Sequence, residues 1–156
     1  GAMPGKRVVL LKPNADPGSR GIVRALDGAH DADGTRVVQA DHMSRSVFIG
    51  LLRRLASSGG VLVGNSSAGL IEAAALGVPV VNVGSRQQGR ERAGNVVDVQ
   101  SETAQAVQEA ISKAQSLDLT GLNHPYGDGD AGARIAAHLA ALDPHTSAIT
   151  RKLCAY

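Results

Sequence analysis

The chain has little sulfur and very few aromatic residues. It contains a single cysteine, Cys154, and only 2% of its 156 residues are aromatic. One cysteine excludes a disulfide within the chain and is typical of a reducing compartment, so we expect a cytoplasmic protein. With so few aromatic rings, a folded core has to consist mainly of Val, Leu, Ile and Ala side chains.

Long apolar runs and clusters of one charge are also missing. No apolar run approaches the roughly 18 to 20 residues of a membrane-spanning helix. Sixteen basic and fourteen acidic residues give a net charge of +2, and no basic cluster is interleaved with aromatic residues. We therefore expect binding to neither membranes nor nucleic acid. His30, His124, His138 and His145 lack the spacing of metal ligands, and we expect neither a metal nor another cofactor.

Strand-like and helix-like segments alternate along almost the whole chain. The apolar run at residues 8–11 is typical of a strand buried on both faces. Alternation of this kind predicts an α/β fold, here a Rossmann-like three-layer αβα domain around a parallel sheet. Residues 1–3 resemble the remnant of an expression tag, which leaves one domain over 4–156. The expected strands are 7–12, 36–39, 61–63, 80–83 and 96–99, and the expected helices follow Ser19 and cover 48–55, 67–76, 104–114 and 135–142.

The most informative segment joins the third strand to the following helix. It reads Gly-Asn-Ser-Ser-Ala-Gly over residues 64–69, directly before an apolar helical run. A helix that begins at the carboxyl end of a strand presents unpaired N–H groups, which bind anions such as phosphate. Ser66 and Ser67 add hydroxyl groups, and Gly69 permits close approach to the backbone. Glu72 lies further along the same helix face, where its carboxylate could accept hydrogen bonds from a ribose diol.

Two interpretations of this segment stay open, a nucleotide diphosphate site and an ordinary capped helix with a solvated Glu72. Three further loops, at 14–19, 42–44 and 84–89, are expected at the same sheet edge. Arg86 could form a bidentate pair with a phosphate, or it could be an ordinary surface arginine. The loop at His42 could hold a nucleobase through its backbone, although a solvated histidine is the simpler explanation.

Two shorter motif matches do not support a function. Residues 127–132 fit the pattern G-x-G-x-x-G, but they follow Asn-His-Pro-Tyr and not a strand, as a dinucleotide site requires. Residues 64–69 have the glycine spacing of a phosphate loop, but Leu70 and Ile71 replace its Lys and Ser or Thr.

Three blocks of sequence, taken in order, resemble the UDP-N-acetylglucosamine 2-epimerase family. These blocks are residues 63–72, 77–90 and 95–99. Residues 13–19 and 126–129 are similar to the hydrolysing branch, which forms N-acetylmannosamine and UDP for sialic acid synthesis. The resemblance extends over the chain from Lys6 onward.

The resemblance implies the carboxyl-terminal half of a GT-B fold, whose two Rossmann-like domains hold the active site between them. The N-terminal domain and the catalytic residues are then expected upstream of Gly1, and the isolated chain is expected to be inactive. The implied ligand is UDP or a UDP-N-acetylhexosamine. The implied UDP-binding residues are Ser66, Ser67, Gly69, Glu72, Arg86, His42 and Met43, and Asn14 and Asp16 would lie in a loop on the substrate side.

Apolar surface left exposed by the missing domain is expected to favour a homo-oligomer. Two alternatives remain beside the epimerase. The chain could be a stand-alone nucleotide-binding or regulatory module, or it could be the donor-binding domain of a GT-B glycosyltransferase.

Overall fold

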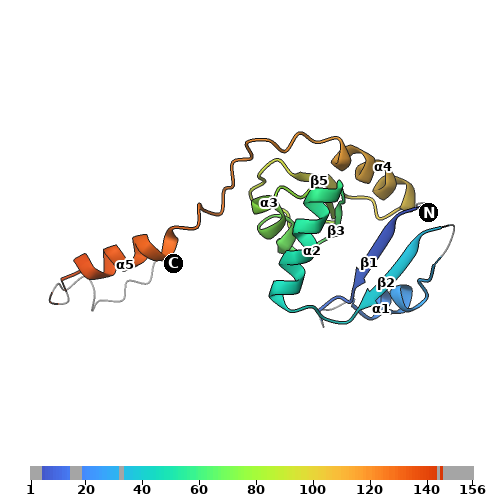
Figure 1. Cartoon of the computed structure of the whole chain (residues 1–156), viewed down its shortest axis with the longest axis horizontal. Helices are drawn as coiled ribbons and strands as arrows, with labels where there is room; N and C mark the ends of the chain where they lie inside the picture. The colour runs from blue at the N-terminus through green and yellow to red at the C-terminus, as the bar shows by residue number, and fades with distance from the viewer. Residues whose placement is uncertain (1–4, 15–18, 32–33, 144, 146–156) are drawn as a thin grey trace.

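A computed structural model describes residues 5–14, 19–31, 34–143 and 145 of the chain. Parallel strands alternate with helices, as Figure 1 shows, so the predicted α/β class is confirmed. Each predicted strand is present to within one or two residues. The elements are β1 (Arg7–Leu11), α1 (Ser19–Asp27), β2 (Arg36–Ala40), α2 (Arg45–Ser58), β3 (Leu62–Gly64), the 3-10 turn η1 (Ser67–Gly69), α3 (Glu72–Ala75), β4 (Val80–Val83), β5 (Val96–Val99), α4 (Ala104–Gln115) and α5 (Ala131–Ala141).

The strands form two parallel sheets rather than one continuous sheet. One sheet pairs β1 with β2, and the other has the order β3-β4-β5. The two sheets share no hydrogen-bonded strand pair among the described residues. The loops that follow β3 and β4 therefore leave the same edge of the same sheet, next to one another.

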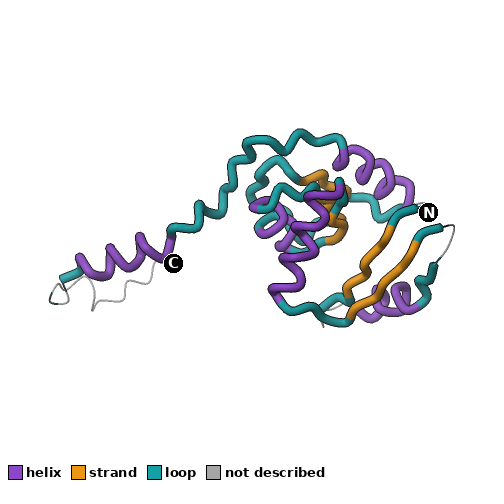
Figure 2. The backbone as a smooth tube through the Cα atoms, viewed as in Figure 1, coloured by secondary structure: helices purple, strands orange, loops and turns teal. Residues whose placement is uncertain are grey.

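Helices cover both faces of the three-stranded sheet, as Figure 2 shows in purple and orange. Successive residues of a strand point to opposite faces, so neighbouring valines of β4 contribute to two separate clusters. The helices α2 and α3 pack on one face and α4 packs on the other, which gives the three predicted layers. The buried clusters are Leu52, Ala73, Val78 and Val80 on the first face and Val81, Val99, Ala110 and Ala114 on the second.

The helix predicted over residues 67–76 is wrong as a continuous element, because it is broken into η1 and α3. The carbonyl oxygen of Gly69 accepts a hydrogen bond from Nδ2 of Asn95 at 3.1 Å, in place of the bond that a continuous helix would give it. Gly69 also lies against β4, where a Cβ atom would approach Cγ1 of Val80 to 2.9 Å. The sheet therefore holds this segment as a turn.

The helix α5 extends away from the rest of the molecule in Figure 1, and none of its residues is buried. A helix is predicted here from Ile135, Leu139 and Leu142, and its presence is confirmed. All three side chains are nevertheless at least half exposed. Within the described part of the chain, no helix has both the length and the apolar character needed to cross a membrane.

Candidate functional site

The turn after β3 begins at Ser66, which caps η1. Its hydroxyl oxygen accepts a hydrogen bond from the backbone N–H of Ala68 at 3.3 Å, so its own O–H remains able to donate to a ligand. The N–H of Gly69 bonds the carbonyl oxygen of Ser66, and the carbonyl oxygen of Ser67 accepts from the next two N–H groups. Four N–H groups, those of residues 68–71, are hence bonded inside the turn. These four N–H groups are therefore not available to a phosphate, and the prediction that helix-start amides bind it is limited to the N–H groups of Ser66 and Ser67. The helix α3, with four residues, supplies no substantial helix dipole.

Glu72 lies at the start of α3 and forms an ion pair with Arg45. The distance from Nη1 of Arg45 to Oε1 of Glu72 is 3.5 Å, and the Glu72 side chain is 25% exposed. Arg45 is the first residue of α2, whose start is capped by Ser44. The ion pair therefore connects Glu72 to the start of α2, directly after the loop that contains His42 and Met43. This loop follows β2 in the two-stranded sheet, and not a strand of the β3-β4-β5 sheet as expected. His42 is exposed in this loop, whereas Met43 is half-buried.

Gln87 connects the loop after β4 to the turn after β3. Its side chain is buried, and its Nε2 donates a hydrogen bond to the carbonyl oxygen of Asn65 at 2.8 Å. Gly84 and Gly89 adopt φ values of 79° and 77° at the two ends of this loop, in the left-handed region that favours glycine. Because Gln87 follows Arg86, the contact places the exposed Arg86 on a loop that touches the Ser66 turn.

Arg92 and Asp98 fix the far end of the same loop. Nε and Nη2 of Arg92 donate to the two carboxylate oxygens of Asp98 at 3.2 and 3.1 Å, and Nη2 also donates to the carbonyl oxygen of Gln87 at 3.1 Å. The hydrogen bond from Arg92, followed by the one from Asn82, holds the pKa of Asp98 below its usual value. The loop is therefore tied both to β5 and to the turn after β3.

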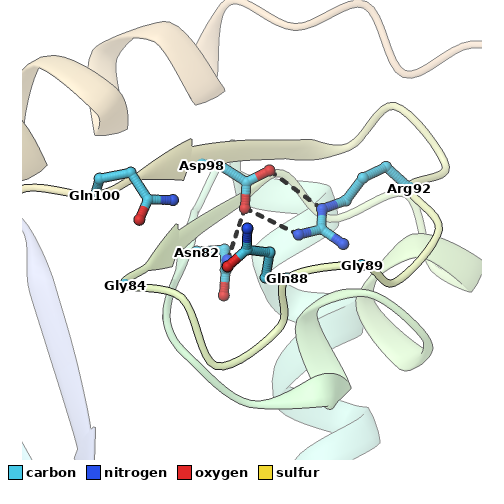
Figure 3. A pocket seen from close by; sticks show the side chains of 7 residues that line it. All are labelled: Asn82, Gly84, Gln88, Gly89, Arg92, Asp98 and Gln100. Atoms are coloured by element: carbon cyan, nitrogen blue, oxygen red, sulfur yellow. Dashed lines mark hydrogen bonds and ion pairs between the residues drawn. The ribbon is translucent and has the colours of Figure 1, made fainter.

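A small pocket lies beside this cluster, at the carboxyl end of β4 and β5. Its volume is about 160 Å³. Figure 3 shows the Asp98 carboxylate between Asn82 and Arg92 on one side of this pocket. The residues that line it are Asn82, Gly84, Gln88, Gly89, Arg92, Asp98 and Gln100.

No contact of the described residues brings Asn14 to this site. Asn14 is exposed after β1, in the separate two-stranded sheet, and Asp16 lies outside the described residues. Residues 127–132 do not follow a strand but lead into α5, which agrees with the rejection of a dinucleotide motif. Among the residues described, no three His, Cys, Asp or Glu side chains gather as a metal site would require.

Three residues of the site escaped the sequence analysis. Arg45 and Gln87 make the contacts that join the loops. Gln87 lies in a block of the family resemblance, but nothing in that block indicates that its side chain is buried, and Arg45 lies outside these blocks. His124 is the third, because its Nε2 lies 2.9 Å from the carbonyl oxygen of Ile71, directly before Glu72. Only the position of Arg45 next to the predicted nucleobase loop could have indicated its role.

Comparison with known proteins adds independent information. Residues 2–140 match the family model of UDP-N-acetylglucosamine 2-epimerase. The chain is 35% identical over 150 residues to a UDP-N,N'-diacetylbacillosamine 2-epimerase (hydrolyzing) of Legionella pneumophila, a match covering 96% of this chain and 38% of that protein. It is 29% identical over 126 residues to a UDP-N-acetylglucosamine 2-epimerase of Neisseria meningitidis serogroup B, covering 81% of this chain and 31% of that protein.

A third relative is a GDP/UDP-N,N'-diacetylbacillosamine 2-epimerase (hydrolyzing) of Campylobacter jejuni. The identity is 27% over 107 residues, which cover 68% of this chain and 27% of that protein. The chain thus spans between 27% and 38% of the length of these three relatives.

Proposed function

The chain belongs to the UDP-N-acetylglucosamine 2-epimerase family, and from this we propose that it is the UDP-binding part of a UDP-sugar 2-epimerase. The observation that carries the proposal is the contact between three loops at one side of the β3-β4-β5 sheet. The ion pair of Arg45 with Glu72 joins the segment after β2 to the segment after β3. The hydrogen bond of Gln87 to Asn65 joins the segment after β3 to the loop after β4. A ligand with separate base, ribose and phosphate groups would contact all three.

Each group of UDP has a matching partner in this arrangement. The carboxylate of Glu72 has two oxygens, and one ion pair at 3.5 Å leaves acceptor capacity for the two ribose hydroxyls. The O–H of Ser66 and the guanidinium of Arg86 would bind the diphosphate, with Ser67 and Gly69 beside them. The loop with His42 and Met43 would contact the uracil. When the bond between sugar and UDP breaks, the donors on the diphosphate would stabilise the negative charge of the departing group.

We further propose that the complete protein is a hydrolysing enzyme that releases UDP and an N-acetylmannosamine-type sugar for sialic acid-type synthesis in the cytoplasm. The names of two hydrolysing relatives support the reaction type. The share of each relative that the chain leaves unmatched supports a second, N-terminal Rossmann-like domain that completes a GT-B fold. Because that domain would carry the acid and base groups, the chain alone is expected to bind UDP without turning over a UDP-sugar.

Calorimetric titration of UDP tests the binding site. We expect Glu72→Gln to weaken UDP binding about tenfold, because a hydrogen bond to a charged group contributes about 1.5–3 kcal/mol and the neutral bond that glutamine can still accept about 0.5–1.5 kcal/mol. Arg45→Gln breaks the same ion pair but should keep most of the affinity. Glu109→Gln, on the exposed side of α4, is the matched control and should bind as the wild type does. No UDP binding by the wild type, or equal affinity in Glu72→Gln, would remove the assignment.

A further inference from the structure

Asn82 carries a buried acceptor that the protein leaves unused. Its side chain is 2% exposed, and its Nδ2 donates to Oδ1 of Asp98 at 2.6 Å. Only the nitrogen of the amide can donate to a carboxylate, so this bond fixes which atom is Oδ1. That Oδ1 is buried and has no hydrogen-bond partner. A buried amide oxygen without a donor costs free energy, and Asn82 is one of the residues that line the pocket, so a ligand in this pocket can supply the missing donor.

The space beside Asn82 is large enough for a chemical group and not just for one atom. The pocket measures about 160 Å³, far more than a single water molecule requires. Asn82 lies two residues after Val80 on β4, so it lies on the face of β4 that the turn containing Gly69 covers. Gln87 connects this turn to the residues of the pocket through its contacts with Asn65 and Arg92.

The charges in this pocket cancel each other. Arg92 makes four hydrogen bonds, two of them to Asp98 and the others to the carbonyl oxygens of Arg90 and Gln87. Since its charge is matched by Asp98, the pocket presents no unbalanced cation for a phosphate. Its other side chains are the amides of Gln88 and Gln100, which Figure 3 shows near Asn82 and Asp98 respectively. Each of these amides can donate and accept a hydrogen bond.

We propose that this amide-lined pocket binds an acetamido group of the nucleotide sugar. The group's N–H donates to Oδ1 of Asn82, and its carbonyl oxygen accepts from the side-chain amide of Gln88 or Gln100. A secondary amide has one donor and one acceptor, which is the pair that these side chains complement, and it carries no charge. The inference rests on the proposed function for the position of UDP at the Ser66 turn, and it adds a determinant of sugar specificity.

The test compares UDP, UDP-N-acetylglucosamine and UDP-glucose, which has a hydroxyl in place of the acetamido group, by calorimetric titration. The wild type is expected to bind UDP-N-acetylglucosamine about threefold to tenfold more tightly than UDP-glucose, the range of one or two neutral hydrogen bonds. Asn82→Leu keeps a side chain of similar shape but removes the acceptor. The preference for UDP-N-acetylglucosamine over UDP-glucose should then disappear, while UDP itself binds unchanged. The exposed double variant Gln88→Ala with Gln100→Ala should reduce the preference, and Gln108→Ala on α4 is its control.

The proposal would be overturned if both variants still preferred UDP-N-acetylglucosamine over UDP-glucose, or if the wild type showed no such preference. The pocket would then hold solvent only. An NMR titration with N-acetylglucosamine, with glucose as the control sugar, separates this result from a failure of the proposed function. If UDP does not bind, shifts of the Asn82 and Gln88 side-chain amides with N-acetylglucosamine alone would still support the pocket. If those resonances respond to neither sugar or to both equally, the pocket does not recognise an acetamido group.

Discussion

A single buried amide, that of Asn95, holds the turn on which the candidate site depends. Asn95 is fully buried, and its Nδ2 donates to the carbonyl oxygens of Gly69 at 3.1 Å and Val78 at 3.0 Å. Both acceptors lie in the segment between β3 and β4. The side chain thus satisfies the carbonyl oxygen of Gly69 in place of a helical N–H, and it ties the end of the segment at Val78 to the same amide.

We expect Asn95→Leu to lower the free energy of unfolding by about 1–3 kcal/mol, because two buried carbonyl oxygens lose their donor. Oδ1 of Asn95 has no partner, so its removal offsets part of that loss. Chemical denaturation measures the change. Asn123→Leu, at an exposed position, is the control and should stay within about 0.5 kcal/mol of the wild type. A fully stable Asn95→Leu protein would show that packing alone holds the turn.

The residues of the site differ in how far the sequence could predict them. Ser66 and Glu72 follow a strand in a recognisable pattern, and Ser66 does cap the turn. Gln87 could not be predicted, because a glutamine between polar loop residues gives no sign that it is buried. Arg45 follows the predicted nucleobase loop, but its partner could not be predicted, since the ion pair forms with a residue 27 positions later. Contacts between distant segments depend on the tertiary structure, and no local pattern encodes them.

At the scale of the element, the local pattern predicted most strands and helices and failed where a distant side chain intervened. Residues 67–76 have the apolar spacing of a helix. The hydrogen bond from Asn95 to the carbonyl oxygen of Gly69, 26 positions earlier, nevertheless interrupts that helix. The strands were predictable because each is a short apolar run beside turn residues. The division of the strands into two sheets could not be predicted, because the sequence of one strand does not specify which other strand it pairs with.

The start of α5 depends on a carboxylate whose charge the structure stabilises. Nη1 and Nη2 of Arg134 donate to the two oxygens of Asp128 at 2.8 and 2.9 Å, and the N–H of Asp130 also donates to this carboxylate. The hydrogen bonds from Arg134, followed by that from Asp130, lower the pKa of Asp128 to about 2. Because the folded form binds this proton less tightly than the unfolded chain, the ionised carboxylate stabilises the folded form at a pH above its ordinary pKa near 4. This stabilisation is lost as the pH falls to about 2, where Asp128 becomes protonated in the folded form too.

We therefore expect the order of the segment before α5 to decline between about pH 4 and pH 2. Carbon-detected NMR can follow the Asp128 carboxyl group and the backbone shifts of α5 in one titration. In Arg134→Ala the pKa of Asp128 should rise toward its ordinary value, and Asp128→Asn should remove the transition. An Asp128 that titrates near pH 4 in the wild type would contradict the bidentate pair.

At the scale of the whole molecule, the chain combines a well-packed centre with an uncovered helix. The sheet β3-β4-β5 is enclosed by α2, α3 and α4, whereas no residue of α5 is buried. The chain also covers at most 38% of the length of the three relatives described above. Uncovered apolar side chains on one face of a helix favour contact with another surface, which in the isolated chain can be a second copy.

The apolar face of α5 is exposed in the described part of the chain. Ile135 and Leu139 are 58% and 63% exposed and lie four residues apart, hence on one side of α5. The double variant Ile135→Ser with Leu139→Ser should reduce self-association, seen as a smaller rise of the sedimentation coefficient with concentration. The free energy of unfolding should change little, because both side chains are already exposed. Ala137→Ser, on the opposite side of the helix, should sediment as the wild type does. Equal concentration dependence in all three proteins would show that the apolar face of α5 does not drive association.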